Sequence, residues 1–147
     1  MPLTFTKYYL SVLIVVLLTG CTITGEHYIR NLTGETIQVS LISTSSLDES
    51  QFTFNFSDQV VQVKRTSYKN MNLKITPEFL SPSEIKIDLP PTSTIHIGAG
   101  SNLDSYIFSH LIIHRENEKE SINLKDSGKI KTKKAGLFRY VAYLDIN

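Results

Sequence analysis

Residues 105–115 read Ser-Tyr-Ile-Phe-Ser-His-Leu-Ile-Ile-His-Arg and form the longest strand candidate in the chain. Successive side chains of a strand point to opposite faces. One face is therefore expected to carry Tyr106, Phe108, His110, Ile112 and His114. The other face is expected to carry Ile107, Ser109, Leu111 and Ile113. Because both faces are partly apolar, we expect this strand to lie in the interior of a sheet.

The same alternation recurs on both sides of this segment. It marks the segments 27–30, 36–42, 51–56, 58–66, 70–75, 84–89, 94–97, 121–124 and 137–146. Residues rich in Gly, Pro, Asn and Ser separate them, and no segment carries a useful amphipathic helical pattern. Short strands at about 8–12-residue spacing are typical of sandwiches and barrels. The chain is therefore predicted to be all-β, a single antiparallel β-sandwich with an Ig-like or transthyretin-like outline.

Several local features follow from the same pattern. Segments 27–30 and 36–42 flank a turn-rich stretch and are expected to form a hairpin. Segment 76–83 contains two prolines, so it cannot be a central strand. The loop Gly98–Asn102 is expected to be flexible. The residues expected to point inward from the weaker runs are Val61, Val63, Met71, Leu73 and Ile75.

The N-terminus carries a different signal. Lys7 precedes an apolar run over 8–18, which ends in Leu18-Thr19-Gly20-Cys21. The order of basic, apolar and small residues is that of a secretory signal. The apolar run is far shorter than the roughly 20 residues that a membrane-spanning helix needs. A permanent transmembrane anchor is therefore not expected.

Leu18-Thr19-Gly20-Cys21 resembles the lipobox of bacterial lipoproteins. The resemblance implies cleavage between Gly20 and Cys21, a diacylglyceryl group on the Cys21 thiol, and acylation of the new N-terminus, for example by palmitate. It also implies the division into a signal peptide (1–20), a lipidated cysteine with a short tether (21–26) and the β-sandwich domain (27–147). The alternative is a secreted protein whose signal happens to end near a cysteine.

The sequence around the cysteine also bears on location. Cys21 is the only cysteine, so the domain has no internal disulfide. By analogy with lipoprotein sorting, Thr22 is not the Asp that retains lipoproteins in the inner membrane, which favours the outer membrane. The stretch after Cys21 lacks a cluster of Lys and acids, which favours a periplasm-facing position over the cell surface.

Charge is balanced overall but uneven along the chain. Without Lys7 the bases and acids are equal in number, so nothing points to nucleic acid as a partner. Between 125 and 139 a single acid, Asp126, accompanies Lys125, Lys129, Lys131, Lys133, Lys134 and Arg139. One interpretation is a solvated hairpin in which Lys protects a strand edge. The other is a patch for anionic lipid headgroups or an acidic partner.

No residue pattern supports catalysis or metal binding. His110 and His114 are four residues apart on a strand, roughly 13 Å, and cannot share one zinc ion. The Gly98-Ala99-Gly100 stretch lacks the following helix that a phosphate loop requires. Glu116, Glu118 and Glu120 are interpreted as solvated carboxylates. We therefore expect no enzyme activity, metal or cofactor.

The sequence favours a non-catalytic envelope lipoprotein that is held at the membrane by its lipid anchor and binds an envelope protein partner. A small-molecule or glycan-binding lipoprotein is the alternative, and a hydrolase is less favoured. The suggested binding surface comprises Tyr106, Phe108, His110 and His114. The aromatic rows of Phe52, Phe54 and Phe56, and of Phe138 and Tyr140, are interpreted as core.

Overall fold

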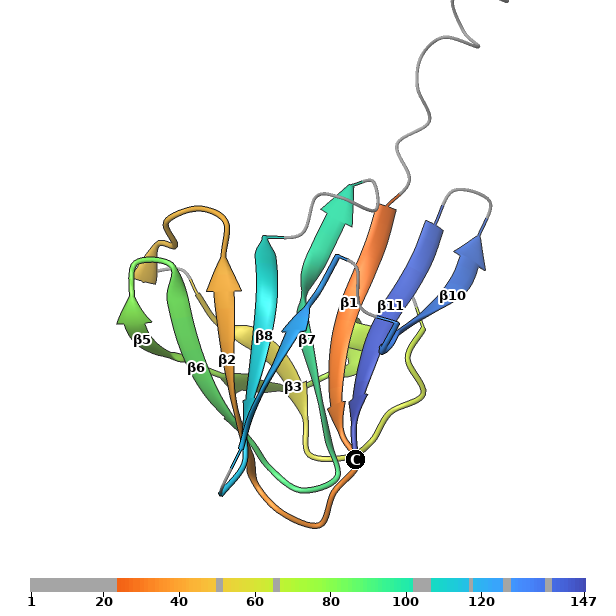
Figure 1. The fold of residues 1–147 in the computed structure, drawn as a ribbon. Coiled ribbons are helices and arrows are strands. Elements are labelled where there is room, and N and C mark those ends of the chain that lie inside the picture. Colours follow the sequence, from red (N-terminus) through yellow and green to blue (C-terminus); the bar gives the residue numbers. More distant parts are fainter. Residues whose placement is uncertain are drawn as a thin grey trace, which may run out of the picture.

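The computed structural model describes residues 24–49, 52–64, 67–101, 107–116, 118–125, 128–136 and 139–147. Nearly all regular structure in these ranges is β (Figure 1). The strands are β1 (Thr24–Asn31), β2 (Ile37–Ser43), β3 (Phe54–Ser57), β4 (Leu73–Ile75), β5 (Glu78–Ser81), β6 (Glu84–Leu89), β7 (Ser93–Ser101), β8 (Phe108–His114), β9 (Lys119–Asn123), β10 (Ile130–Gly136) and β11 (Arg139–Ile146). A 3-10 turn, η2, spans Ser67–Asn70.

The strands form two sheets that pack face to face (Figure 1). One is six-stranded with the order β10-β11-β1-β7-β3-β4, and the other is five-stranded with the order β5-β6-β2-β8-β9. Neighbouring strands are antiparallel except β1 and β11, which are parallel. The predicted all-β sandwich is confirmed. Strand β8 lies between β2 and β9, in the interior of its sheet as expected.

The main hydrophobic core lies between the two sheets. Both sheets supply aliphatic side chains to it, because alternate positions of each strand face the partner sheet. Fully buried examples are Ile29, Val39, Leu41, Ile85, Leu89, Ile95 and Leu111. Aromatic rings close the core near β3, where Phe54 and Phe56 are buried and Phe52 is partly buried. The buried members of this core run from Ile29 to Ile146.

A second, smaller cluster covers the outer face of the six-stranded sheet. Its buried members are Tyr28, Val63, Met71 and Val141. Residues 58–64 were expected to be a strand, but they form none. Instead this stretch and η2 lie across the outer face, so Val63 is buried there rather than between the sheets. Leu73, expected inward, is 45% exposed.

Two further expectations are wrong. Segments 27–30 and 36–42 do not form a hairpin, because β1 and β2 belong to different sheets. The expected loop at Gly98–Asn102 is largely strand, since Gly98 to Ser101 pair with β1. Strand β7 has a bulge opposite His27 and Tyr28. Gly98 adjoins this bulge with a φ of 133°, a backbone conformation that favours glycine over other residues.

The parallel pairing of β1 and β11 defines two ends of the sandwich. At one end, which we name the entry end, Thr24 lies beside Arg139, where the β10–β11 hairpin turns (Figure 1). Strand β1 already begins at Thr24, so residues 24–26 belong to the sheet rather than to the expected tether. At the opposite, distal end, buried Asn31 donates hydrogen bonds to the carbonyls of Glu35 (2.8 Å), Leu89 (3.0 Å) and Pro90 (2.8 Å).

Candidate functional site

The binding surface suggested by the sequence does not exist as one face. A bulge in β8 changes its register, because Ile42 pairs with His110 while Ser43 pairs with Phe108. Phe108 is thereby turned into the core, 1% exposed, with its ring 6.2 Å from that of Phe54. His110 and His114 stay half-buried on the outer face of the sheet. Tyr106 lies outside the described residues.

The outer-face histidines have hydrogen bonds of their own. His114 Nε2 lies 3.0 Å from the hydroxyl of buried Ser40, and His110 Nδ1 lies 3.0 Å from the hydroxyl of Ser109. Over the described part of the chain, no group of three or more His, Cys, Asp or Glu side chains is arranged to hold a metal ion. These histidines therefore serve as hydrogen-bonding groups on a sheet surface.

The residues of the lipobox resemblance, Leu18, Thr19, Gly20 and Cys21, lie outside the described residues. Cys21 precedes Thr24, the first residue of β1, by three positions in the sequence. Among the residues that the structure describes, no helix is both long and apolar enough to cross a membrane.

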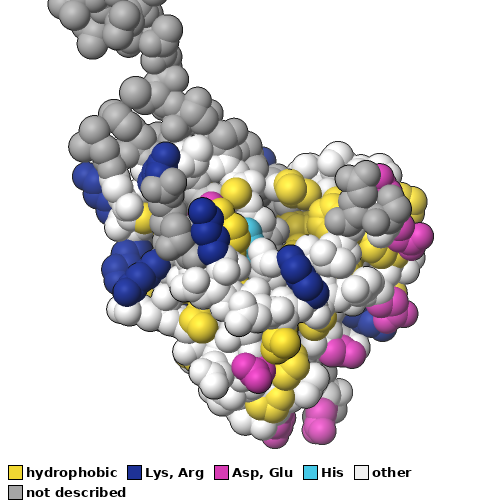
Figure 2. Space-filling view, turned by 180° about the vertical axis from the view of Figure 1, so that it is seen from behind, with side chains coloured by type: hydrophobic (Ala, Val, Ile, Leu, Met, Phe, Trp, Pro, Cys, Tyr) yellow, Lys and Arg dark blue, Asp and Glu magenta, His cyan; other side chains and the backbone are white. Residues whose placement is uncertain are grey.

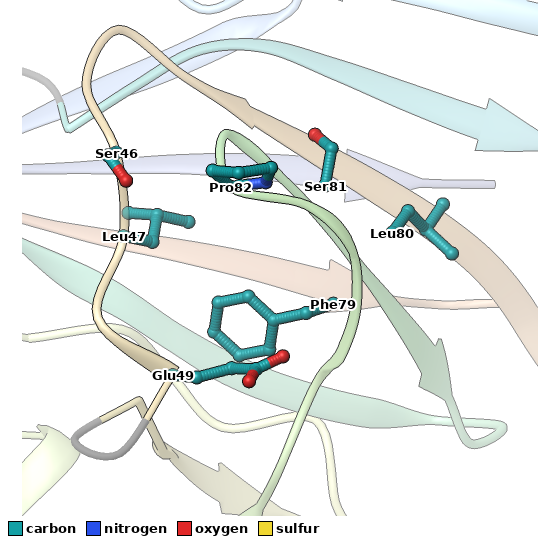
Figure 3. A pocket seen from close by; sticks show the side chains of 7 residues that line it. All are labelled: Ser46, Leu47, Glu49, Phe79, Leu80, Ser81 and Pro82. Atoms are coloured by element: carbon teal, nitrogen blue, oxygen red, sulfur yellow. The ribbon is translucent and has the colours of Figure 1, made fainter.

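A pocket of about 430 Å³ lies between strand β5 and the loop at residues 46–49 (Figure 3). Among the described strands, β5 lies at the edge of its sheet and pairs with β6. The amide of Leu47 donates to the carbonyl of Pro82 at 2.8 Å, which holds the loop beside the β5–β6 turn. Figure 3 shows the Phe79 ring directed toward the loop and the carboxylate of Glu49 beside this ring.

The pocket combines apolar contact with negative charge. Leu47, Phe79 and Pro82 supply its apolar lining, and Glu49 supplies a carboxylate. Leu80, which also lines the pocket, is 49% exposed. On this side of the molecule, hydrophobic and acidic side chains lie together (Figure 2). No local sequence pattern predicted this pocket, because its two walls belong to segments that meet only in the folded chain.

The basic segment forms the opposite edge of the molecule. Strand β10 is the edge strand of the six-stranded sheet, and its lysines are exposed. Lys131 pairs with Asp145 at 2.9 Å, and Lys129 pairs with Glu120. Lys133 and Lys134 follow, nearer to the turn of the hairpin. This arrangement fits a solvated edge that resists pairing with other strands.

A Glu–His pair on the outer face of the six-stranded sheet was not anticipated from the sequence. His96 Nε2 lies 2.7 Å from a carboxylate oxygen of Glu26, which joins β7 to β1. The His96 ring lies between Tyr68, which stacks on it at 4.8 Å, and Tyr28, at 5.0 Å. The Tyr28 hydroxyl donates to the carbonyl of Lys64 at 3.2 Å and accepts from the amide of Tyr68 at 3.3 Å.

Burial controls the protonation of this region. Desolvation lowers the pKa of His96, although its hydrogen bond to Glu26 acts in the opposite direction. The lowered pKa favours the neutral imidazole of His96 at pH 7. Desolvation also raises the pKa of the Tyr28 phenol, so Tyr28 remains protonated. The Glu26–His96 pair links β1 to β7 and lies beside the rings of Tyr28 and Tyr68.

Comparison with known proteins adds no family. The chain matches no protein-family model, no curated protein and no solved structure. The functional argument therefore rests on the pocket beside β5 and on the charge distribution around the sandwich.

Proposed function

We propose that this protein is a lipid-anchored, non-catalytic binding module of the cell envelope, whose β-sandwich holds a protein partner at the pocket beside β5. The proposal favours the outer membrane and a periplasm-facing domain. The observation that carries it is the combination of an open strand edge, an exposed leucine and a pocket with one carboxylate.

The anchor part of the proposal is supported by the lipobox resemblance at Cys21 and by the early start of β1. Two or more acyl chains hold a protein stably on a bilayer, whereas one gives only marginal binding. With two residues between Cys21 and Thr24, such an anchor would hold the domain close to the membrane surface.

The partner part is supported by the chemistry of the pocket. An edge strand offers unpaired backbone groups to an extended segment of another protein. Leu80 and the apolar lining offer contact area, and Glu49 selects a positive charge. A Lys or Arg side chain fits both the apolar lining and the Glu49 carboxylate. Its stem would contact the apolar groups, while its cation would lie near the carboxylate and the face of the Phe79 ring. We therefore propose a partner with an extended segment that carries a basic residue.

Site-specific crosslinking tests this assignment. A photo-crosslinking residue at position 80 is expected to trap one partner in intact envelopes, and Glu49→Lys is expected to abolish the product. The matched control carries the crosslinker at position 73, because Leu73 is also an exposed leucine on an edge strand, 45% exposed, in the other sheet. Equal products from positions 80 and 73, or a product unaffected by Glu49→Lys, would refute the assignment of this pocket.

The anchor is tested separately with Cys21→Ala. The variant is expected to lose metabolic labelling by fatty acid and to leave the membrane fraction. Continued labelling in the variant would show that Cys21 is not the lipidated residue.

The alternative function, a small-molecule or glycan-binding lipoprotein, can be tested at the same pocket. A ligand present at about 100 times its Kd stabilises a protein by about 2.7 kcal/mol. A thermal-shift screen with envelope saccharides that raises the Tm of the wild type but not of Glu49→Lys would favour this alternative over a protein partner.

A further inference from the structure

We propose that the entry end of the β10–β11 hairpin is a docking surface for anionic lipid headgroups, with Lys133 and Lys134 as its principal contacts. The inference rests on the proposed lipid anchor at Cys21 and adds a second, electrostatic attachment to it. Its occupant is the bilayer surface in which the anchor is embedded.

The position of the hairpin relative to the chain entry is the first argument. Lys134 pairs with Tyr140, and Tyr140 pairs with Gly25 near the start of β1. Two strand spacings separate β10 from β1, roughly 10 Å. Cys21 lies three positions before Thr24, a reach of at most roughly 10 Å. Lys134 and the start of β1, which follows the proposed anchor residue by three positions, therefore lie at the same end of the sandwich.

The distribution of charge along β10 is the second argument. Lys129 and Lys131, toward the distal end, are partly neutralised by Glu120 and Asp145. Lys133 and Lys134 are exposed, and neither forms an ion pair with a described residue. Net positive charge thus increases toward the entry end. Lys and Arg side chains gather on the side of the molecule that carries β10 and β11, whereas acids gather on the other side (Figure 2).

The distances match the range of the force. The potential of an anionic membrane decays over a Debye length, about 8–10 Å at moderate salt. Each Lys or Arg near such a surface increases partitioning about fivefold. A domain on a short anchor holds both lysines inside this range, so the anionic surface restricts its rotation and presents the β5 pocket to the side.

Vesicle binding by the unanchored chain tests the proposal independently of lipidation. A chain of residues 22–147, which contains both hydrophobic clusters, is mixed with vesicles of phosphatidylethanolamine and phosphatidylglycerol or of phosphatidylcholine alone. Co-sedimentation is expected with the anionic vesicles at about 0.1 M salt and is expected to be lost near 1 M, where the Debye length is about 3 Å. Lys133→Glu and Lys134→Glu are each expected to lower the partition coefficient by at least about fivefold.

The matched control is Lys119→Glu, which changes the net charge equally. Lys119 is exposed at the distal end, where it lies opposite His114 in the pairing of β8 with β9. Its variant is expected to stay within about twofold of the wild type, since it lies outside the range of the surface potential. Equal losses from Lys119→Glu and Lys134→Glu would overturn the proposal, as would binding to neutral vesicles alone.

Footprinting of the lipidated protein supplies a second measurement. On anionic vesicles, an amine-reactive reagent is expected to modify Lys133 and Lys134 more slowly than Lys119, and the difference is expected to vanish in neutral detergent. Protection of the hairpin only when a protein partner is added would assign this surface to an acidic protein and would refute the lipid assignment. Failure of Cys21 lipidation would leave the result with the unanchored chain unchanged, so the two proposals fail separately.

Discussion

The two faces of the six-stranded sheet are stabilised by different means. The inner face carries aliphatic residues such as Ile29, Ile95 and Leu144, which pack against the other sheet. The outer face carries directional contacts. Arg30 donates from Nε to Asp145 at 2.6 Å and from Nη2 to the second carboxylate oxygen at 2.8 Å, and its guanidinium lies 4.6 Å from the ring centre of Tyr143.

This difference predicts different weaknesses. Apolar burial depends on area and is insensitive to pH, whereas paired charges depend on geometry and protonation. The inner face is therefore expected to respond most to cavities. The outer face is expected to respond to loss of individual hydrogen-bonding partners.

The largest expected effect is a cavity in the inner core. Phe108→Ala is expected to lower the free energy of unfolding by about 3–5 kcal/mol, because the Phe108 ring is buried against Phe54 and Phe52. On the outer face, Met71→Ala is expected to cost about 2 kcal/mol, since the covering segment has no sheet pairing and can collapse into the space. Urea unfolding measures both. Equal costs would show that the outer cover is as rigid as the core.

Acid is expected to have the next largest effect, through His27 on β1. Burial lowers the pKa of His27 to about 4. Above the unfolded-state value of about 6.5 both states are neutral, and stability is complete. As the pH falls from there toward 4, only the unfolded chain gains a proton, so about 3 kcal/mol is lost progressively. Urea unfolding between about pH 7 and pH 4.5 measures this loss.

The variants separate the two histidines. His27→Gln is expected to remove most of the pH dependence in this range. His96→Gln on the outer face is expected to remove less, because Glu26 opposes the desolvation of His96. The pKa of Asp145 is lowered, because the hydrogen bonds from Arg30 and Lys131 outweigh the effect of its burial. The stability that Asp145 contributes is therefore lost only as the pH falls below its ordinary pKa near 4, outside this range. An unchanged pH dependence in His27→Gln would contradict this assignment.

Loss of Arg30 is expected to cost less. Arg30→Ala leaves the 5%-exposed carboxylate of Asp145 with Lys131 alone. The expected loss is about 1–3 kcal/mol, as for a hydrogen bond to a charged group. NMR titration is expected to show a higher pKa for Asp145 in the variant. Arg115→Ala, which removes an exposed bond to the Asn147 carbonyl, is the control and is expected to cost under about 0.5 kcal/mol.

The smallest expected effect is the removal of one hydroxyl. Tyr28→Phe loses the contacts to the Lys64 carbonyl and the Tyr68 amide, both longer than 3 Å, at an expected cost of about 0.5–1.5 kcal/mol. Amide exchange at Tyr68 is expected to accelerate. Tyr143→Phe keeps a ring below Arg30 and is the matched control. Unchanged exchange at Tyr68 would mean that the hydroxyl does not hold η2 to the sheet.

Sequence alternation predicted the inner face well, because a half-buried strand must repeat every two residues. In the alternating segments 36–42 and 84–89, the apolar residues Val39, Leu41, Ile85, Ile87 and Leu89 are all buried. Alternation fails at a bulge, where one added residue reverses the faces that follow it. This is why Phe108 was separated from His110, and no local residue type marked the change.

Contacts between distant segments were beyond this kind of prediction. The lysines of β10 were visible in the sequence as a charged run at a strand edge. The pocket beside β5, the Glu26–His96 pair and the outer cover were not, because each joins segments that have no pattern in common. The apolar character of Met71 and Val63 predicts that they are buried, but it does not indicate which face of the sheet they cover.

The parallel pairing of β1 with β11 also affects when the six-stranded sheet can assemble during synthesis. Strand β1 lies between β7 and β11, and its contacts to them span 70 residues from Glu26 to His96 and 115 residues from Arg30 to Asp145. A chain that emerges N-terminus first cannot complete the six-stranded sheet until its last strand has been made, and such distant contacts form slowly. Strand β1 can pair with β7 earlier, but it lacks its parallel neighbour until β11 has been synthesised.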